Sequence, residues 1–325
     1  MLGQRLIADM PNKGESMGKS SRRQFLGAVL CALGAENLPA AAKPERVDPK
    51  PSYDKAKTPG AHGDLKVRFL GTGVGPMGAK GNECGDWRRH TSILLDERVL
   101  VDFTKINFET LPKDCRPEVV FYTHSHPDHC NAEAALALGV KRVYCHESWV
   151  DVARARLAKA ANGRKTPEVL DLKFGAGVVE CGMTFTALPA NHSTGLANEL
   201  CAIYLVEKGP TRLLYAVDTS GLPRQALKFS VNNRRPANPL TAIIMEATAG
   251  IGKQDDAGLF FSHSSVDTVE RTVRALSQTG RYRPPSGRPV YITHLWRPHY
   301  LPQAQTDAAL PNPLRAAYDG LELLL

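Results

Sequence analysis

The stretch Thr123-His124-Ser125-His126-Pro127-Asp128-His129 carries three histidines and one aspartate within six residues, directly after an apolar run that predicts a buried strand. On an extended segment His124 and His126 point to the same side, so both imidazoles can reach one metal ion. Where the chain then turns, Asp128 and His129 can face a second ion beside the first. Such crowded, buried polar groups would be costly without a cation. We therefore predict a metal centre here; a solvated polar loop is the competing interpretation.

Three further candidate ligands stand at the ends of later predicted strands. His192, Asp218 and His294 each follow a short apolar run with the composition of a strand. A single histidine or aspartate in such a place more often caps the backbone or hydrogen-bonds within a loop. Taken in order with the cluster at 124–129, the three residues indicate one shared metal centre.

These residues resemble the His-x-His-x-Asp-His motif and the later ligands of the metallo-β-lactamase superfamily, and the resemblance covers about residues 65–325. It implies two divalent metal ions, with zinc as the first candidate and manganese or iron as alternatives. One ion would be held by His124, His126, His192 and Asp218. The other would be held by Asp128, His129, Asp218 and His294. The implied fold is α/β, a four-layer αβ/βα sandwich of two mixed β-sheets with outer helices.

The pattern of short strands and helices agrees with such a sandwich. Strands are expected at 65–70, 92–95, 99–103, 118–123, 183–188, 201–206, 212–217, 241–245 and 289–293, with a turn at Asp96-Glu97. Helices are expected at 131–138, from Ser148 to about 161, at 222–230 and at 265–278. Gly139 should end the first helix, Ser148 and Asp151 resemble a capping box, and Pro223 suits a first helical turn. Val266, Val269, Val273 and Leu276 form one apolar face of the last helix.

Glu246 and His263 indicate a particular branch of the superfamily. Glu246 follows a predicted strand and His263 precedes the last predicted helix, a pair similar to that of the tRNase Z, PhnP and PqqB-like branch. There the histidine assists phosphoryl chemistry, and Glu246 would orient it. The competing interpretation of His263 is a helix-capping or surface residue. The stretch 82–87 holds only Cys84, so the cysteine-rich zinc loop of PhnP-type enzymes is not expected.

Together the residues and the resemblance predict a dinuclear metal-dependent hydrolase that acts on a small or cyclic phosphodiester by metal-activated hydroxide attack. Asp128 would orient the nucleophile, and His263 would protonate the leaving alkoxide. A lactonase, thioesterase or other acyl-ester hydrolase on the same metal site is the alternative, because acyl transfer has less need of the Glu246–His263 pair. A third interpretation is a non-catalytic binding relative, against which the complete ligand set argues.

The first forty-odd residues predict an export signal. Arg22 and Arg23 stand directly before the apolar run 25–34, which is too short to span a bilayer, and the small-residue patch 39–42 follows. This layout resembles the twin-arginine signal of bacterial export, with a disordered basic tail as the alternative. The protein would then be periplasmic or otherwise exported, with the twin-arginine export machinery as a partner. The expected divisions are a twin-arginine signal peptide at 1–42, a flexible linker at 43–63 and a catalytic domain at 64–325.

The overall composition fits a soluble globular protein, with 42% hydrophobic and 23% charged residues. The formal charge of +8 is spread along the chain, without the basic stripe of a nucleic-acid binder. A small-molecule ester or phosphodiester substrate is therefore expected, with no stable nucleic-acid partner and no transmembrane span in the mature protein; a homodimer is left open. The seven cysteines form no Cys-x-x-Cys pair, so most should be small buried apolar residues.

Overall fold

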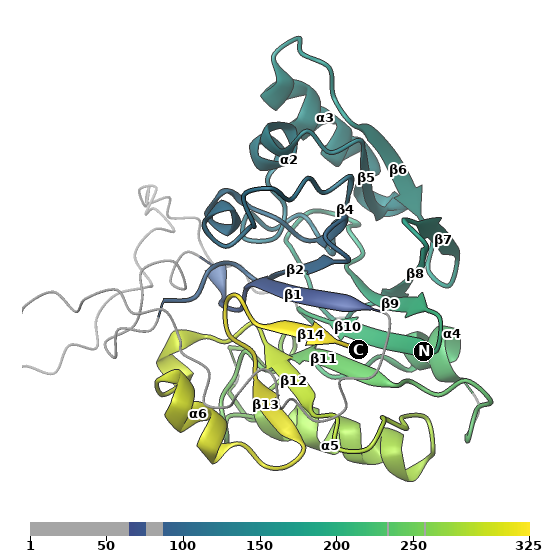
Figure 1. The fold of residues 1–325 in the computed structure, drawn as a ribbon, viewed down its shortest axis with the longest axis vertical. Helices are drawn as coiled ribbons and strands as arrows, with labels where there is room; N and C mark the ends of the chain where they lie inside the picture. Colours follow the sequence, from purple (N-terminus) through teal and green to yellow (C-terminus); the bar gives the residue numbers. More distant parts are fainter. Residues whose placement is uncertain (1–64, 76–86, 233, 257) are drawn as a thin grey trace, which may run out of the picture. The chain divides into compact units, whose positions relative to one another are not determined.

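Two seven-stranded β-sheets pack face to face at the centre of the fold in the computed structural model (Figure 1). The structure describes residues 65–75, 87–232, 234–256 and 258–325. The predicted signal peptide at 1–42, the predicted linker at 43–63 and Cys84 lie outside these residues.

The first sheet has the strand order β14-β1-β2-β3-β4-β5-β6. Its members are β1 (Lys66–Gly71), β2 (Ser92–Leu95), β3 (Val99–Val101), β4 (Val119–Phe121), β5 (Arg142–His146), β6 (Glu168–Leu172) and β14 (Glu322–Leu324). The strands from β3 to β6 are parallel, and the remaining neighbours are antiparallel. The predicted turn joins β2 to β3, and its residues Asp96 and Glu97 both have positive φ, which suits the twist of a tight hairpin.

The second sheet has the strand order β13-β12-β11-β10-β9-β8-β7. Its members are β7 (Gly177–Glu180), β8 (Met183–Pro189), β9 (Ala202–Lys208), β10 (Thr211–Ala216), β11 (Ala242–Glu246), β12 (Val290–Thr293) and β13 (Leu314–Ala316). The strands from β7 to β10 are antiparallel, whereas β10 to β13 run parallel. Both sheets are therefore mixed.

Helices cover the outer face of each sheet (Figure 1). They are α2 (Ala132–Leu138) and α3 (Val150–Ala161) on the first sheet, and α4 (Arg224–Val231) and α5 (Val266–Gln278) on the second. One apolar cluster lies between the sheets, and two others lie between each sheet and its helices. This arrangement confirms the predicted four-layer α/β sandwich. The remaining helical segments are α6 (Gln303–Ala309), which contacts β13, and the 3₁₀ turns η2 (Lys105–Glu109), η3 (Glu147–Trp149) and η4 (Arg297–His299).

Local sequence signals explain where two of the helices begin and end. The side chain of Asn131 accepts a hydrogen bond from the backbone N–H of Ala134 at the start of α2, and Gly139 ends that helix with a φ of 70°. Ser265 caps α5 in the same way. The predicted apolar face of α5 is buried, as its residues Val266, Val269, Val273 and Leu276 show.

Two predicted helix starts were wrong in detail. Instead of a capping box at Ser148, a 3₁₀ turn precedes α3, and Trp149 occupies the N-cap without a side-chain hydrogen bond. Pro223 is the N-cap of α4 rather than a residue of its first turn. The strands β5, β6, β7, β13 and β14 were not predicted. Several of them lie at sheet edges, where partly exposed residues blur the apolar pattern.

No helix among the described residues combines the length and the apolar character needed to cross a bilayer. The cysteines of these residues are all free, and Cys115, Cys145 and Cys201 are buried, as expected for small apolar side chains.

Glu180 connects the two sheets at one end of the sandwich. It lies at the end of β7, and its carboxylate accepts hydrogen bonds from Arg142 Nε at 2.6 Å and Arg142 Nη2 at 2.7 Å on β5. Tyr144 Oη donates to the same carboxylate at 2.6 Å. Burial raises the pKa of Glu180, but the hydrogen bonds from Arg142 and Tyr144 outweigh it and hold the pKa below the ordinary 4.5. The ionised form is therefore stabilised by folding.

We predict that Glu180→Gln lowers the free energy of unfolding by about 1–3 kcal/mol at pH 7, because charge-assisted hydrogen bonds are lost. A depressed folded pKa contributes stability above pH 4.5, and this contribution disappears as the pH falls toward the folded pKa. Urea unfolding at pH 7 and below pH 4.5 should therefore show a difference between wild type and variant that shrinks in acid. Glu147→Gln is the control, since its pair with Lys173 is exposed and long at 3.6 Å. An equal difference at both pH values would contradict the assignment.

Candidate metal centre

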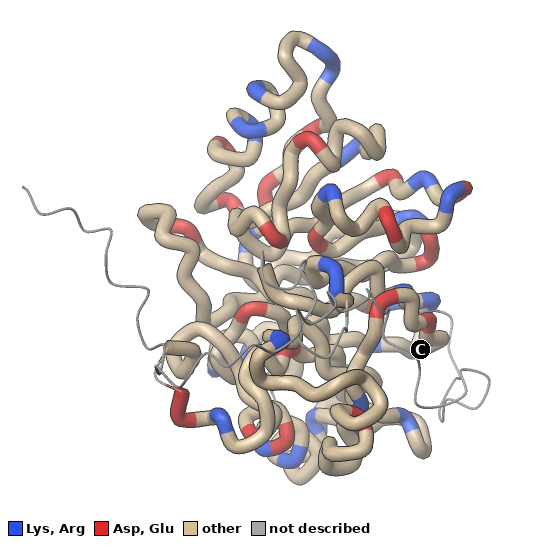
Figure 2. The backbone as a smooth tube through the Cα atoms, turned by 90° about the vertical axis from the view of Figure 1, so that its left-hand side faces the viewer, with Lys and Arg blue, Asp and Glu red and all other residues tan. Residues whose placement is uncertain are grey.

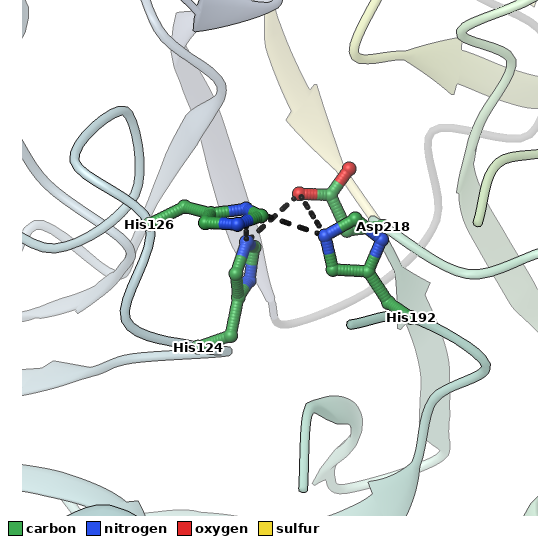
Figure 3. Close-up of side chains that lie close together, drawn as sticks. All are labelled: His124, His126, His192 and Asp218. Atoms are coloured by element: carbon green, nitrogen blue, oxygen red, sulfur yellow. Dashed lines mark hydrogen bonds and ion pairs between the residues drawn. The ribbon is translucent and has the colours of Figure 1, made fainter. Parts of the chain in front are cut away.

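The candidate ligands lie at the carboxyl ends of strands from both sheets. His124 and His126 follow β4 of the first sheet, whereas His192 follows β8, Asp218 follows β10 and His294 follows β12 of the second. Strands β8, β10, β11 and β12 run in the same direction, so their carboxyl ends meet at one edge. Figure 3 shows His124, His126 and His192 directed toward the carboxylate of Asp218.

The first group of ligand atoms comes from His124, His126, His192 and Asp218, and these atoms all lie within 4.8 Å of one another. His124 Nε2 is 3.0 Å from His126 Nδ1 and 3.1 Å from Asp218 Oδ2. His192 Nε2 is 3.3 Å from His126 Nδ1 and 3.9 Å from Asp218 Oδ2. Ligand atoms about 2 Å from a tetrahedral ion lie roughly 3.3 Å apart, so these separations suit one shared cation.

The second group lies on the other side of Asp218. Ligand atoms of Asp128, His129 and His294 are within 4.8 Å of one another. His129 Nε2 is 3.2 Å from His294 Nε2, 3.7 Å from Asp128 Oδ2 and 2.9 Å from Asp218 Oδ2. The structure therefore brings together all seven residues that the sequence indicated as ligands, with the Asp218 carboxylate next to both groups.

Hydrogen bonds behind the imidazoles orient their inward nitrogens. Thr123 Oγ1 donates to Asp102 Oδ2 at 2.8 Å, so its oxygen can accept the Nδ1–H of His124 at 2.9 Å. His129 Nδ1 lies 2.7 Å from Asp102 Oδ2 and donates to it. When these rings are neutral, Nε2 carries no proton in either, and its lone pair faces the cluster.

His192 and His294 have the same arrangement. The Nδ1 of His192 is 3.0 Å from the backbone carbonyl of Ser262, which can only accept a hydrogen bond. The Nδ1 of His294 is 2.8 Å from Thr248 Oγ1, whose hydroxyl donates to Glu246 Oε2. In the neutral rings Nε2 is again unprotonated and points inward. Four imidazoles thus present lone pairs to one small volume, which is what metal binding requires.

Burial keeps most of these rings neutral. It lowers the pKa of His124 to about 3 and that of His294 to about 4. Burial also lowers the pKa of His126. At neutral pH these three histidines are therefore available as ligands without first losing a proton.

His129 differs because carboxylates surround it. Burial lowers its pKa, but the surrounding negative charges raise it well above 6.5; they come from Asp218, Asp102 and Asp128. The pKa of Asp218 lies well below 3.8, since the attraction of His294 and His129 outweighs the effect of burial. The site therefore concentrates negative charge that a cation would neutralise in place of a proton.

Asp218 shows most directly that the residues fit divalent cations. Its Oδ1 is buried and accepts no hydrogen bond from any described residue. The closest ring nitrogens are 3.2 Å away on His294 and 3.3 Å away on His263, and both donate elsewhere. A buried carboxylate oxygen that accepts no hydrogen bond is costly, even with the charged ring of His263 beside it. The His and Asp side chains, taken with their inward lone pairs, support the binding of divalent metal ions here.

Glu246 and His263 border the same carboxylate. His263 Nδ1 lies 3.1 Å from Glu246 Oε2 and 3.3 Å from Asp218 Oδ1. The other oxygen of Glu246 accepts a hydrogen bond from the backbone N–H of Thr219. His263 does not cap α5, because Ser265 does so, and its side chain keeps 15% of its surface exposed. The interpretation of His263 as a helix cap is therefore wrong.

The charge state of His263 is set by its acidic neighbours. Burial lowers its pKa, but Glu246 and Asp218 raise it to about 11, so the ring is protonated at neutral pH. A cation beside Asp218 would lower this pKa by repulsion. Ligand atoms of Asp218, Glu246, His263 and His294 also lie within 4.8 Å of one another, so the geometry permits a cation among them as well.

Sequence reasoning missed Asp102, which supports both the 123–124 segment and His129. It follows β3, is fully buried and also accepts a hydrogen bond from the backbone N–H of Thr123 at 2.8 Å. An acid that directly follows an apolar strand was the available signal. Asp102 has a φ of 57°, and Asp218 and His294 have φ values of 50° and 57°. Such left-handed backbone conformations are unfavourable outside glycine and cluster at functional sites.

Comparisons with known proteins bear on the family and the fold. The family described as a beta-lactamase superfamily domain matches residues 101–294. Zinc-bound PqqB from Methylobacterium extorquens is 15% identical with a TM-score of 0.60, covering 80% of this chain and 100% of that one. A diphosphatase of the PhnP family is 19% identical with a TM-score of 0.56, over 80% of this chain and 96% of that one. Yeast PDE1 is 12% identical with a TM-score of 0.57, covering 81% of this chain and 100% of that one.

At these identities the likeness concerns the fold alone. No curated protein matches the chain.

We predict that metal analysis of the purified protein finds two divalent ions per chain. Asp218→Ala should leave fewer than one ion, because its carboxylate borders both groups, whereas His192→Ala should leave about one. Inductively coupled plasma mass spectrometry of the dialysed protein measures the number of metal ions per chain. His299→Gln is the control, because its ring stacks edge-on against Trp296 and belongs to none of the candidate ligand groups. Two ions retained by Asp218→Ala would contradict the shared role.

Proposed function

We propose a phosphodiesterase activity for this chain, which belongs to the beta-lactamase superfamily. Membership of that superfamily supports a hydrolase that uses divalent metal ions. The finer proposal is a dinuclear enzyme that cleaves a small or cyclic phosphodiester. The observation that carries it is the Glu246–His263 pair, which borders the shared carboxylate of Asp218 and in which the His263 side chain is partly exposed.

The metal ligands in this proposal are the two groups around Asp218. Two bound divalent cations would supply an acidified water as nucleophile and positive charge for the negative charge that develops at phosphorus. Zinc is the first candidate, and manganese or iron also suit mixed histidine and aspartate ligands. Asp128 is held by the backbone N–H of Gly75, 2.9 Å from its Oδ2. Burial raises the pKa of Asp128, but His129 and other histidines lower it to about 2, so it can orient the nucleophile as an anion.

His263 is placed to protonate the leaving oxygen. Its Nδ1–H is held by Glu246, which leaves Nε2–H as the proton that can be given to the departing alkoxide. Glu246 is itself fixed by Thr219 and Thr248, so the ring cannot swing freely. Protonation of the leaving group matters most for an alkoxide, which is a much stronger base than an aryl oxide.

The charge distribution on the face in view gives no support to a nucleic-acid substrate. Figure 2 shows Lys and Arg interspersed with Asp and Glu along the backbone of the face in view. A groove that tracks a nucleic-acid backbone would need one continuous basic stripe. The acyl-ester alternative, hydrolysis of a lactone or thioester on the same ligands, has less need of the Glu246–His263 pair as an acid.

We predict that His263→Ala reduces kcat for phosphodiester hydrolysis by about 10²–10⁴-fold while both metal ions stay bound, because only proton donation is lost. The loss should be larger for an alkyl phosphodiester than for bis(4-nitrophenyl) phosphate, whose leaving group needs no proton. Steady-state rates on both substrates, with metal content measured in parallel, test this.

Glu246→Gln is the matched variant. We expect it to lose less kcat than His263→Ala, and again to lose more on the alkyl phosphodiester than on bis(4-nitrophenyl) phosphate. Unchanged turnover by His263→Ala would remove the residue from the mechanism. Hydrolysis of lactones by the wild type without hydrolysis of phosphodiesters would favour the acyl-ester alternative. No hydrolysis of either class by the metal-loaded protein would favour a non-catalytic binding role.

We further propose that residues 1–42 direct export through the twin-arginine route. The support is the Arg22-Arg23 pair before a short apolar run. We predict that replacing both arginines by lysine keeps the charge but reduces the periplasmic fraction to background, as measured by cell fractionation. Arg5→Lys is the control, because it lies outside the pair. Normal export of the double variant would refute the proposal.

A further inference from the structure

Ser125 lies between His124 and His126, and each of its polar groups is held from outside the motif. Its backbone N–H donates to Glu199 Oε1 at 2.7 Å, and its hydroxyl donates to Glu199 Oε2 at 2.6 Å. Its carbonyl accepts a hydrogen bond from Arg156 Nη1 of α3 at 2.7 Å. Ser125 is only 4% exposed, whereas Glu199 and Arg156 are half-buried. The backbone that carries both imidazoles is therefore fixed from two sides.

The same carboxylate also holds the segment that follows His192. Thr194 Oγ1 donates to Glu199 Oε2 at 2.5 Å, and the backbone N–H of Leu196 bonds to Thr194 Oγ1 at 3.2 Å. The backbone N–H of Glu199 in turn donates to the carbonyl of Leu196. The Glu199 side chain thus closes the segment 194–199 into a loop. This loop begins two residues after His192.

This segment is anchored to the rest of the fold just beyond Glu199. The backbone N–H of Leu200 donates to Ser148 Oγ at 2.9 Å, and that of Ala202 donates to the carbonyl of Thr123 at 2.9 Å. Glu199 therefore has a fixed position from which to hold the two ligand segments, although it is 74 residues from Ser125 in the chain.

The ligands of the second group are held by other residues. Asp102 holds His129, the Gly75 N–H holds Asp128, and Thr248 holds His294. Among the described residues, the Glu199 carboxylate accepts hydrogen bonds from Ser125 and Thr194 and from none of these three ligands. Glu199 thus supports one half of the centre, whereas Asp102 is shared, because it holds His129 directly and His124 through Thr123.

We propose that Glu199 is the positioning residue of one half of the centre, setting His124, His126 and His192 in place for a single cation. The inference rests on the proposed function in that it requires the site to bind metal. Residues behind metal ligands typically change metal affinity by about 10–100-fold when they are replaced. Because Glu199 contacts only one half, its replacement should weaken one ion and spare the other.

The test is a metal titration of the full chain with Zn²⁺ in competition with a chromophoric chelator, which gives two dissociation constants. Glu199→Gln should weaken one ion by about 10–100-fold and leave the other within about threefold. Thr248→Val is the matched control: it removes the support of His294 and should weaken the other ion. In a His192→Ala background, which already lacks the affected half, Glu199→Gln should have no further effect on the remaining ion.

Two milder variants keep the test decisive if Glu199→Gln does not fold. Ser125→Ala and Thr194→Val each remove one hydrogen bond to Glu199 and should each give a smaller loss at the same ion. Equal weakening of both ions, or no weakening in any of the three variants, would overturn the inference. A wild-type chain that binds no Zn²⁺ would instead refute the proposed function, so the two failures can be told apart.

Discussion

The carboxylate of Asp218 must stay ionised where water hardly reaches it, and the arrangement of the centre follows from that requirement. Its Oδ2 lies 2.9 Å from His129 and 3.1 Å from His124, while its Oδ1 has no hydrogen-bond donor among the described residues. A buried charge is tolerated only when it is paired. Without metal, the protonated rings of His129 and His263 provide part of that pairing, and divalent cations would provide it in their place.

The sandwich supplies the rigid frame that this charge needs. Strands β8, β10, β11 and β12 end at one edge of the second sheet, and β4 ends opposite them in the first. Side chains at strand ends are held by the sheet behind them, which leaves little freedom to relax away from one another. The left-handed backbone at Asp218 and His294 turns these residues inward at a cost that the packed sheets sustain.

The residues around the candidate metal ligands have different roles. Asp102 and Thr248 determine which ring nitrogen of His129 and His294 carries the proton. Glu199 instead holds the segments that contain Ser125 and Thr194. The Glu246–His263 pair is joined to these supports through Thr248, whose hydroxyl donates to Glu246, but the His263 ring is partly exposed and carries a proton. The residues that hold the ligands therefore differ from His263, the proposed proton donor.

The sequence by itself indicated the candidate ligands, the strand ends that carry them and the helix limits at Asn131 and Gly139, because these depend on residue order, spacing and local backbone chemistry. It also indicated Glu246 and His263 through their order in the chain. Only the tertiary structure decided that Asp102 supports His129 and that Glu199 joins two ligand segments. Those contacts join residues 27 and 74 positions apart, and their geometry depends on how the two sheets pack rather than on any local pattern.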